Sequence, residues 1–106
     1  MSETESSGRV VVLATDLMDR SKISGAFPAA TFVRSPERLV QEATSATLVL
    51  VDLTGLGDAA VLTEIQARVV AYGSHLNHNE LTAAEAAGAE ALPRSVFFRR
   101  LSAQEL

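Results

Sequence analysis

The chain has 106 residues, enough for one domain with one core, and it contains no cysteine, which excludes disulfides and thiolate metal sites. Its formal charge of −4 argues against nucleic acid as a partner. No apolar stretch approaches the roughly 18 residues that a membrane span requires, and the amino terminus lacks the pattern of a secretion signal. These features predict a cytoplasmic protein that binds neither nucleic acid nor membrane.

Residues 1–8 (MSETESSG) are polar and predict a disordered tail, so that a single domain spans residues 9–106. A buried strand follows at residues 9–14 (RVVVLA), because β-branched and apolar side chains fill its middle.

The next segment, residues 16–27 (DLMDRSKISGAF), predicts a helix. Asp16 or Thr15 can cap it, and Asp19 lies in the first turn, where the helix dipole favours an anion. The side chains expected to pack against the core are Leu17, Ile23 and Phe27.

Residues 29–34 (AATFVR) predict a shorter, partly polar strand at an edge of the sheet. Ser35 then supplies a capping hydroxyl, and Pro36 suits the first position of a helix. This helix should end near Ser45.

An unbroken apolar run at residues 48–51 (LVLV) predicts a central strand buried on both faces. It ends in Asp52, followed by a loop that contains Gly55 and Gly57. Asp58 is the expected cap of a further helix. The glycines fit neither the dinucleotide-binding nor the P-loop pattern, so no nucleotide cofactor is expected.

The last third of the chain repeats the alternation of strand and helix. A strand is expected at residues 68–72 and a brief one at residues 89–92, with Asn77 and Glu80 forming a capping box for the helix between them. Gly88 should end that helix, because glycine readily takes a positive φ. A short final helix is expected at residues 96–104.

Strands alternate with helices five times along the chain. This order predicts an α/β protein with a doubly wound, five-stranded parallel sheet and helices on both faces.

Two segments resemble the receiver domain of two-component response regulators. They are VLVDLTGLGD (residues 49–58) and AAEAAGAEALPRSVFF (residues 83–98), and the resemblance extends from residue 9 to about residue 101. It implies a flavodoxin-like fold with strand order 2-1-3-4-5. It also implies a site at the carboxyl ends of the first, third, fourth and fifth strands.

The resemblance implies that Asp52 occupies the phosphoacceptor position. Receivers hold Mg²⁺ with two adjacent acids at the end of the first strand, and these positions fall at Ala14 and Thr15. Asp16, one residue further on, could replace one of the two acids. We therefore predict no metal site, and if one exists it consists of Asp16 and Asp52.

The family's hydroxyl residue after the fourth strand falls at Gly73, with Ser74 next to it. Its lysine after the fifth strand falls at Ser95 or Arg94, and the chain's one lysine, Lys22, lies in the first helix. These departures predict a degenerate receiver, or pseudo-receiver. Its crevice would contain Asp16, Thr15, Gly73, Ser74, Arg94 and Ser95.

Other interpretations stay open for Asp52 and for the residues after the fourth strand. Asp52 could serve only to accept backbone N–H bonds from the loop that follows it. His75 and His78 could suggest a metal pair, and Ser74 with His75 a hydrolase couple. Neither set has a visible third member, and no nucleophile elbow surrounds Ser74.

The carboxyl-terminal helix is the expected partner surface. Arg99 and Arg100 make it locally basic, which suits either a solvated helix or a docking surface for an acidic partner. Phe97 and Phe98 are adjacent, so one should enter the core and the other lie partly exposed near Tyr72. In receivers, the face of helix four, strand five and helix five binds partners. A short last helix should leave part of the sheet or of helix four less covered, which favours association there.

The leading hypothesis is a stand-alone pseudo-receiver without enzymatic activity or cofactor. It would bind another protein, or a second copy of itself, through the helix four to helix five face. The alternative is an atypical receiver that uses Mg²⁺ and is phosphorylated on Asp52. A weaker alternative is a small-molecule-binding protein or small enzyme that uses the crevice of Asp52, Ser74 and Arg94.

Overall fold

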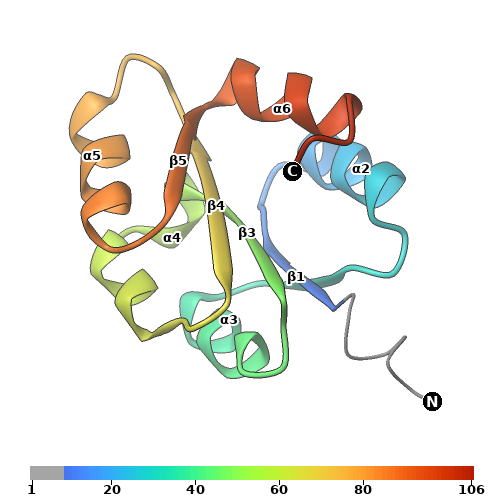
Figure 1. Ribbon diagram of the computed structural model, residues 1–106, viewed down its shortest axis with the longest axis horizontal. Helices are drawn as coiled ribbons and strands as arrows, with labels where there is room; N and C mark the ends of the chain where they lie inside the picture. The colour runs from blue at the N-terminus through green and yellow to red at the C-terminus, as the bar shows by residue number, and fades with distance from the viewer. Residues whose placement is uncertain (1–8) are drawn as a thin grey trace.

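The computed structural model describes residues 9–106, so the predicted tail at residues 1–8 lies outside the described part of the chain. The elements alternate along the chain as expected (Figure 1). In order they are β1 (Val10–Leu13), α2 (Leu17–Ala26), β2 (Thr31–Val33), α3 (Pro36–Ala43), β3 (Leu48–Asp52), α4 (Leu53–Leu56), the 3₁₀-helix η1 (Ala59–Glu64), β4 (Arg68–Gly73), α5 (His78–Ala86), β5 (Glu90–Pro93) and α6 (Arg94–Ser102).

The five strands form one parallel sheet in the order β2-β1-β3-β4-β5, which confirms the predicted topology. Val12 of β1 lies opposite Leu50 of β3, and Leu50 lies opposite Val70 of β4. All three side chains are fully buried. The central strands are therefore covered on both faces, as their uninterrupted apolar sequences require.

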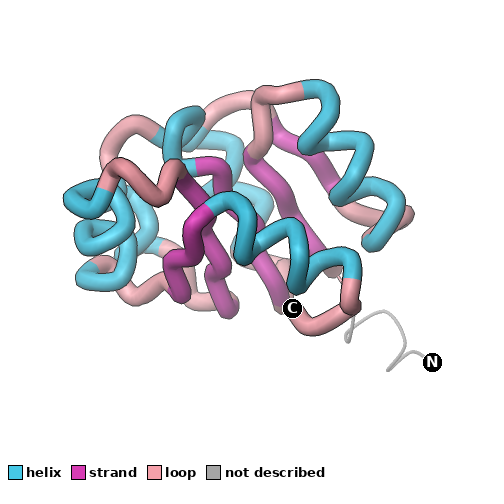
Figure 2. Tube along the Cα trace, turned by 90° about the horizontal axis from the view of Figure 1, so that it is seen from above, coloured by secondary structure: helices cyan, strands magenta, loops and turns pink. Residues whose placement is uncertain are grey.

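Helices cover the sheet on both sides, as the view from above shows (Figure 2). Side chains such as Val11 and Val49 pack beneath α3, α4, η1 and α5. Their neighbours in sequence, Val12 and Leu50, face the opposite way, beneath α2 and α6. This alternation follows from the two-residue period of a strand. In the described part of the chain, every helix is too short or too polar to cross a membrane.

The starts of the helices confirm the predicted caps at Asp16, Ser35 and Asn77. Only one half of the predicted capping box forms, since the backbone N–H of Asn77 donates to the Ser74 carbonyl and not to Glu80. Asp16 Oδ1 accepts hydrogen bonds from the backbone N–H of Met18 and of Asp19, at 2.8 and 3.0 Å. The hydroxyl oxygen of Ser35 and the amide oxygen of Asn77 each accept a bond from the N–H three residues on. Local side chains thus satisfy the first turns of α2, α3 and α5.

The ends of α5 and α6 use the same pair of backbone bonds with different residues. At α5, Ala89 N–H donates to the Ala84 carbonyl at 3.0 Å, around Gly88 with φ +103°. At α6, Glu105 N–H donates to the Arg100 carbonyl at 2.8 Å, around Gln104 with φ +60°. The predicted role of Gly88 is confirmed, and a non-glycine residue plays the same role after α6.

Three details of the prediction are wrong. Leu17 is 76% exposed and contributes nothing to the core, because it lies on the solvent side of α2, whereas Ile23 is fully buried. The loop expected after Asp52 is instead the short helix α4, which Gly57, with φ +83°, separates from η1, whereas the predicted cap Asp58 does begin η1. Helix α6 begins two residues early, at Arg94.

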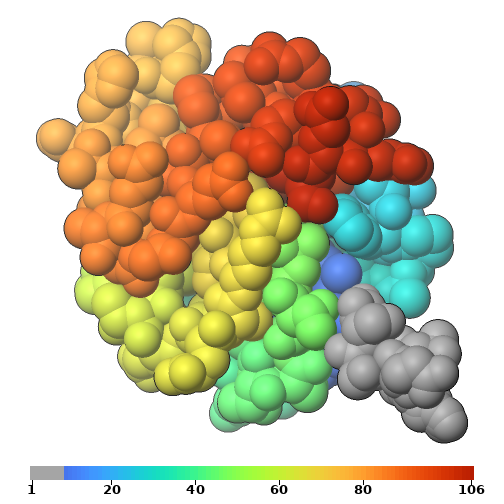
Figure 3. All heavy atoms as spheres, viewed as in Figure 1, coloured from blue at the N-terminus to red at the C-terminus, as the bar shows by residue number. Residues whose placement is uncertain are grey.

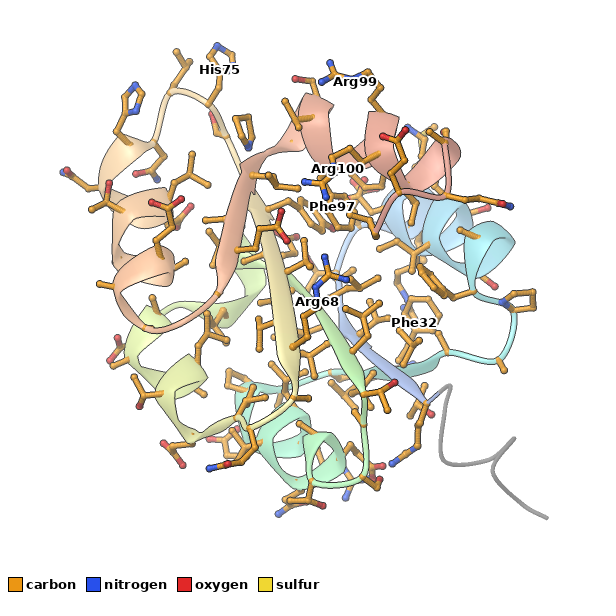
Figure 4. The ribbon with its side chains drawn as sticks, viewed as in Figure 1. Phe32, Arg68, His75, Phe97, Arg99 and Arg100 are labelled. Atoms are coloured by element: carbon orange, nitrogen blue, oxygen red, sulfur yellow. The ribbon has the colours of Figure 1, made fainter. Side chains whose placement is uncertain are left out.

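Helix α6 covers only one end of its side of the sheet. Figure 3 shows atoms of β4, in yellow, at the surface below α6. Here Arg68 and Arg100 both pair with Glu90, at 3.1 and 2.8 Å, and Figure 4 shows the two arginines on this open face. Charged side chains therefore replace helical cover over this part of the sheet.

Candidate functional site

The candidate site lies where β1, β3, β4 and β5 end. Asp52 is the last residue of β3 and lies opposite Tyr72 of β4 in the sheet. Arg94 begins α6 directly after β5, and Asp19 lies in the first turn of α2. The carboxyl edge of a parallel sheet is the usual location of a site in an open α/β fold.

Asp52 is buried, with 7% of its surface exposed. Its Oδ1 accepts a hydrogen bond from the backbone N–H of Thr54 at 3.0 Å, which caps the short helix α4. A bond from the backbone just after Asp52 was expected, although the segment that donates it is the helix α4 and not a loop. Burial raises the pKa of the Asp52 carboxyl above its usual range, although the Thr54 bond and the charge of Arg94 lower it.

A second acid, Asp19, is the centre of a buried polar cluster. Arg94 Nη1 donates to Asp19 Oδ2 at 2.7 Å, and Arg94 Nη2 donates to Asp19 Oδ1. The Tyr72 hydroxyl donates to the same carboxylate at 3.0 Å. Asp19 is fully buried, whereas the side chain of Arg94 is 48% exposed. The guanidinium therefore binds the carboxylate through both of its terminal nitrogens.

Electrostatics within this cluster favour the ionised carboxylate. Burial alone would raise the pKa of Asp19, but the hydrogen bonds from Arg94 and Tyr72 together with the charges of Arg94 and Lys22 outweigh it, and the pKa lies below its usual value. Burial, followed by the charges of Asp52 and Asp19, raises the pKa of the Tyr72 hydroxyl. Tyr72 thus stays neutral and acts as a hydrogen-bond donor.

Aromatic rings hold Arg94 in place. Tyr72 stacks on Phe97 with ring centroids 4.3 Å apart, and Phe98 meets both rings edge to face. The guanidinium carbon of Arg94 lies 5.0 Å from the centre of the Phe98 ring and 5.8 Å from that of Tyr72. Such cation–π contacts add to the ion pair and limit the orientations open to Arg94.

The predicted crevice residues are only partly brought together. Asp52 and Arg94 lie close enough for each to influence Tyr72, but the charge of Arg94 is paired with Asp19. Asp16 is used as the cap of α2. Thr15 is exposed and contacts Gly55, where an added Cβ would lie 3.1 Å from the Thr15 methyl group.

The remaining predicted residues, Gly73, Ser74 and Ser95, lie at and just beyond the carboxyl ends of β4 and β5. Gly73 is buried, and an added Cβ there would lie 3.4 Å from Leu53. The Ser74 hydroxyl accepts a bond from Leu76 N–H at 3.1 Å, and Ser95 is exposed in the first turn of α6.

His75 and His78 are exposed, and Figure 4 shows His75 projecting away from the sheet. Within residues 9–106, no group of three or more His, Cys, Asp or Glu side chains is placed to hold a metal ion.

The predicted interface residues divide between core and surface. Phe97 is fully buried, so its assignment to an interface is wrong; Tyr72 and Phe98 cover it. Phe98 is partly buried, as expected for the outer of the two rings. Arg99 is exposed and points away from the sheet (Figure 4). Arg100 donates to Glu90 and to the backbone carbonyl of Glu105.

The sequence did not reveal the structural importance of Asp19. It was assigned only to the first turn of a helix, and its partner Arg94 lies 75 residues further along the chain. The one available signal in the sequence was that Asp16 already capped the helix, so that a second acid three residues later, Asp19, was not needed for the helix start.

By sequence, the chain matches no protein-family model and no curated protein. Several solved structures match it by fold. A response regulator from Hahella chejuensis superposes with a TM-score of 0.75 at 17% identity, over 93% of this chain and 92% of its own. The beryllofluoride-activated receiver domain of DrrB gives 0.70 at 13% identity, over 91% and 95%. A CheY-like protein (tadZ) from Pseudomonas aeruginosa PAO1 gives 0.63 at 18%, over 89% and 98%.

These similarities extend over nearly the whole of each chain. The protein therefore has the receiver fold, as the sequence resemblance implied. At this level of identity the similarity establishes the fold alone, so function has to be argued from the site.

Proposed function

We propose that this chain is a pseudo-receiver: a receiver-fold module that binds another protein and does not depend on phosphorylation of Asp52. The observation that carries this proposal is the ion pair between Arg94 and Asp19. Arg94 occupies the start of α6, and a buried carboxylate already neutralises it through both terminal nitrogens.

Phosphoryl transfer to a carboxylate requires cations that offset the charge of the incoming group. Beside Asp52, the described residues offer one cation, Arg94. The nearby acids Asp19 and Asp16 add negative charge, which raises the pKa of Asp52. An anionic phosphoryl group at Asp52 would have to compete with Asp19 for Arg94. This competition supports a module that works through its surface.

The proposed partner surface consists of α5, β5 and α6. On α6 it presents the cation Arg99, which is exposed, and the aromatic ring of Phe98, which is partly exposed. The edge strands β2 and β5 have three and four residues, and β5 ends in Pro93, so pairing between sheet edges is disfavoured. Contact through the helices is the remaining mode, with another protein or with a second copy.

The phosphorylation arm is tested by adding Mg²⁺ and beryllofluoride to the protein and following backbone amide shifts by NMR. We expect no saturable change at Asp52, Gly73 or Arg94. Asp52→Asn serves as the control. Saturable shifts that disappear in Asp52→Asn would reverse the proposal and favour the atypical receiver.

The surface arm is tested by light scattering over a range of concentrations. Self-association through α6 predicts a mass that rises with concentration and falls back in Arg99→Glu. Arg38→Glu, on the opposite side of the sheet, serves as the charge-matched control. A strict monomer at every concentration would exclude the second copy as the partner.

A further inference from the structure

A separate cavity of about 280 Å³ lies at the carboxyl ends of β1 and β2. Its lining residues are Ala14, Thr15, Arg20, Val33 and Arg34. It shares none of them with the cluster of Asp19, Arg94 and Tyr72. It is a second place at the same sheet edge where a ligand can enter.

The charge of this cavity is positive and unbalanced. Two of its five lining residues are arginines, and none is an acid. Of the eight arginines in the chain, five pair with a carboxylate. The three without such a pair among residues 9–106 are Arg20, Arg34 and Arg99, so this cavity holds two of the three.

Neighbouring groups pre-organise the cavity for an anion. The guanidinium of Arg20 lies 5.4 Å from the centre of the Phe32 ring, a cation–π contact that limits its motion, and Figure 4 shows Phe32 on the α2 side of the sheet. Thr15 adds a hydroxyl donor. Two acids are adjacent in sequence to lining residues: Asp16 already accepts two backbone N–H bonds at the start of α2, and Asp19 is paired with Arg94.

Two helices also begin beside the cavity. Helix α2 starts after Thr15 and Asp16, and α3 starts after Arg34 and Ser35. The positive ends of their dipoles add to the charge of the two guanidinium groups, although an acid lies in the first turn of each helix.

We infer that this cavity binds a small phosphate, either inorganic phosphate or a compact phosphate monoester, with Arg20 and Arg34 as its principal ligands. Planar guanidinium groups bind phosphate oxygens in pairs, and two of them match a doubly charged anion. The cavity lies just below the usual range of small-molecule sites, about 300 to 1,000 Å³, which limits the ligand to this size.

Thr15 connects this cavity to the segment after Asp52. Its methyl group lies where a Cβ added to Gly55 of α4 would be only 3.1 Å away, so Thr15 and α4 are in close contact. An anion that repositions Thr15 should therefore shift the amide resonance of Gly55. The site does not depend on whether Asp52 is phosphorylated.

The test is a titration of the full chain with inorganic phosphate, and separately with pyrophosphate, in buffer that contains EDTA and no divalent cation. Backbone amide shifts are followed by NMR. We expect saturable shifts at Ala14, Thr15 and Arg34, with a smaller one at Gly55. Arg20→Gln and Arg34→Gln should each weaken binding at least tenfold, and Arg34→Lys should weaken it less. Arg99→Gln, which removes the same charge from α6, should leave binding unchanged.

Several results would overturn the inference. One is the absence of saturation, and another is equal weakening by Arg99→Gln, which would indicate a general charge effect. Shifts centred on Arg94 would place the anion at the other site, and succinate binding as tightly as phosphate would exclude a phosphate-selective site. Melting temperatures of the variants are measured in parallel, and the comparison uses those that melt within a few degrees of the parent.

Discussion

Asp19 and Arg94 are unequal partners in their ion pair, because Asp19 is fully buried and the side chain of Arg94 is half exposed. Removing Arg94 leaves a buried carboxylate without its cation, and we expect Arg94→Met to lower the free energy of unfolding by about 3 kcal/mol. Asp19→Asn leaves Arg94 free to turn to solvent, and an amide oxygen still accepts from Tyr72, so the cost should be about 1 to 2 kcal/mol. Urea denaturation of the two variants gives the comparison.

The stability lost in Arg94→Met should depend on pH, because the ion pair requires an ionised Asp19. The pKa of Asp19 is lowered in the folded state, so its stabilising contribution is present above the unfolded value of about 3.9 and is lost as pH falls through the folded pKa. The deficit of Arg94→Met should therefore shrink in acid, where Asp19 takes up a proton. The buried ion pair would be contradicted if Arg94→Met lost no more unfolding free energy than Asp19→Asn, or if the loss in Arg94→Met grew in acid.

Asp52 behaves in the opposite way. Burial raises its pKa in the folded state, so the native protein loses stability as pH rises from the unfolded pKa of about 3.9 through the higher folded value. Asn keeps the acceptor for Thr54 without the buried charge. We expect Asp52→Asn to raise the free energy of unfolding by about 0.5 to 1 kcal/mol at pH 7, and by nothing below pH ~3.

The matched control is Asp58→Asn. Asp58 is exposed and also caps a helix, accepting from the N–H of Ala60 at 2.9 Å. Because Asp58 is exposed and carries no burial cost, its substitution should change stability by less than about 0.5 kcal/mol. Chemical denaturation at several pH values distinguishes the two sites, and a loss of stability in Asp52→Asn at pH 7 would refute the expectation.

At the residue scale, the sequence predicted contacts that are local. The bond from Thr54 to Asp52 joins residues two apart, and the caps at Asp16 and Ser35 join residues two or three apart. The ion pair of Asp19 spans 75 residues, and no local pattern reports on it. Arg94 was recognised as a crevice residue, but the partner that occupies it was not.

At the scale of the element, the ends of α5 and α6 offer a direct comparison. Both close with the same backbone bonds, but one places glycine in the left-handed region and the other places Gln104 there. A side chain at positive φ costs on the order of 1 kcal/mol. We expect Gln104→Gly to raise the free energy of unfolding by about 0.5 kcal/mol and Gly88→Ala to lower it by about 1 kcal/mol.

Thermal unfolding followed by circular dichroism measures both changes. Gly25→Ala provides the control, since Gly25 lies inside α2 with open space around it and no positive φ. Alanine should stabilise the helix there by about 0.5 to 1 kcal/mol. If Gln104→Gly destabilised the protein, the proposed ending of α6 would be wrong.

Helix starts were predictable because Asp16, Ser35 and Asn77 are capping residues that lie within one turn of them. Asp58 likewise predicted the start of the helix after Gly57, but the short helix α4 and the 3₁₀ form of η1 were not predicted, because they depend on Gly57 taking a positive φ and on the local geometry of a single turn. Neither leaves a clear trace in the spacing of apolar residues.

At the scale of the whole molecule, alternation of strand and helix predicted the layers, while the order of the strands came from resemblance to receivers. The open part of the sheet below α6 was anticipated from a short last helix. The ion pairs of Arg68 and Arg100 with Glu90, which cover this open part of the sheet, were not anticipated. The three residues come from three different elements.

This architecture predicts how stability is distributed over the sheet. Strands β1, β3 and β4 have neighbours on both edges, and β3 is buried along its whole length. Strand β2 has one neighbour, and two of its three side chains are partly exposed. Opening of β3 therefore requires loss of both cores, whereas β2 can open by releasing one edge.

Hydrogen exchange followed by NMR as a function of urea should rank the strands accordingly. Amides of β3 and β4 are expected to exchange only through global unfolding, with free energies that approach the full stability of about 5 to 15 kcal/mol. Amides of β2 and β5 should exchange through smaller openings with weaker dependence on urea. Arg94→Met should lower the exchange free energies of β3 and β4 by the same amount as its global destabilisation, because Asp19 and Tyr72 join α2 to the sheet centre. Equal protection of β2 and β3 would show that the edges are held by contacts beyond those of the described chain.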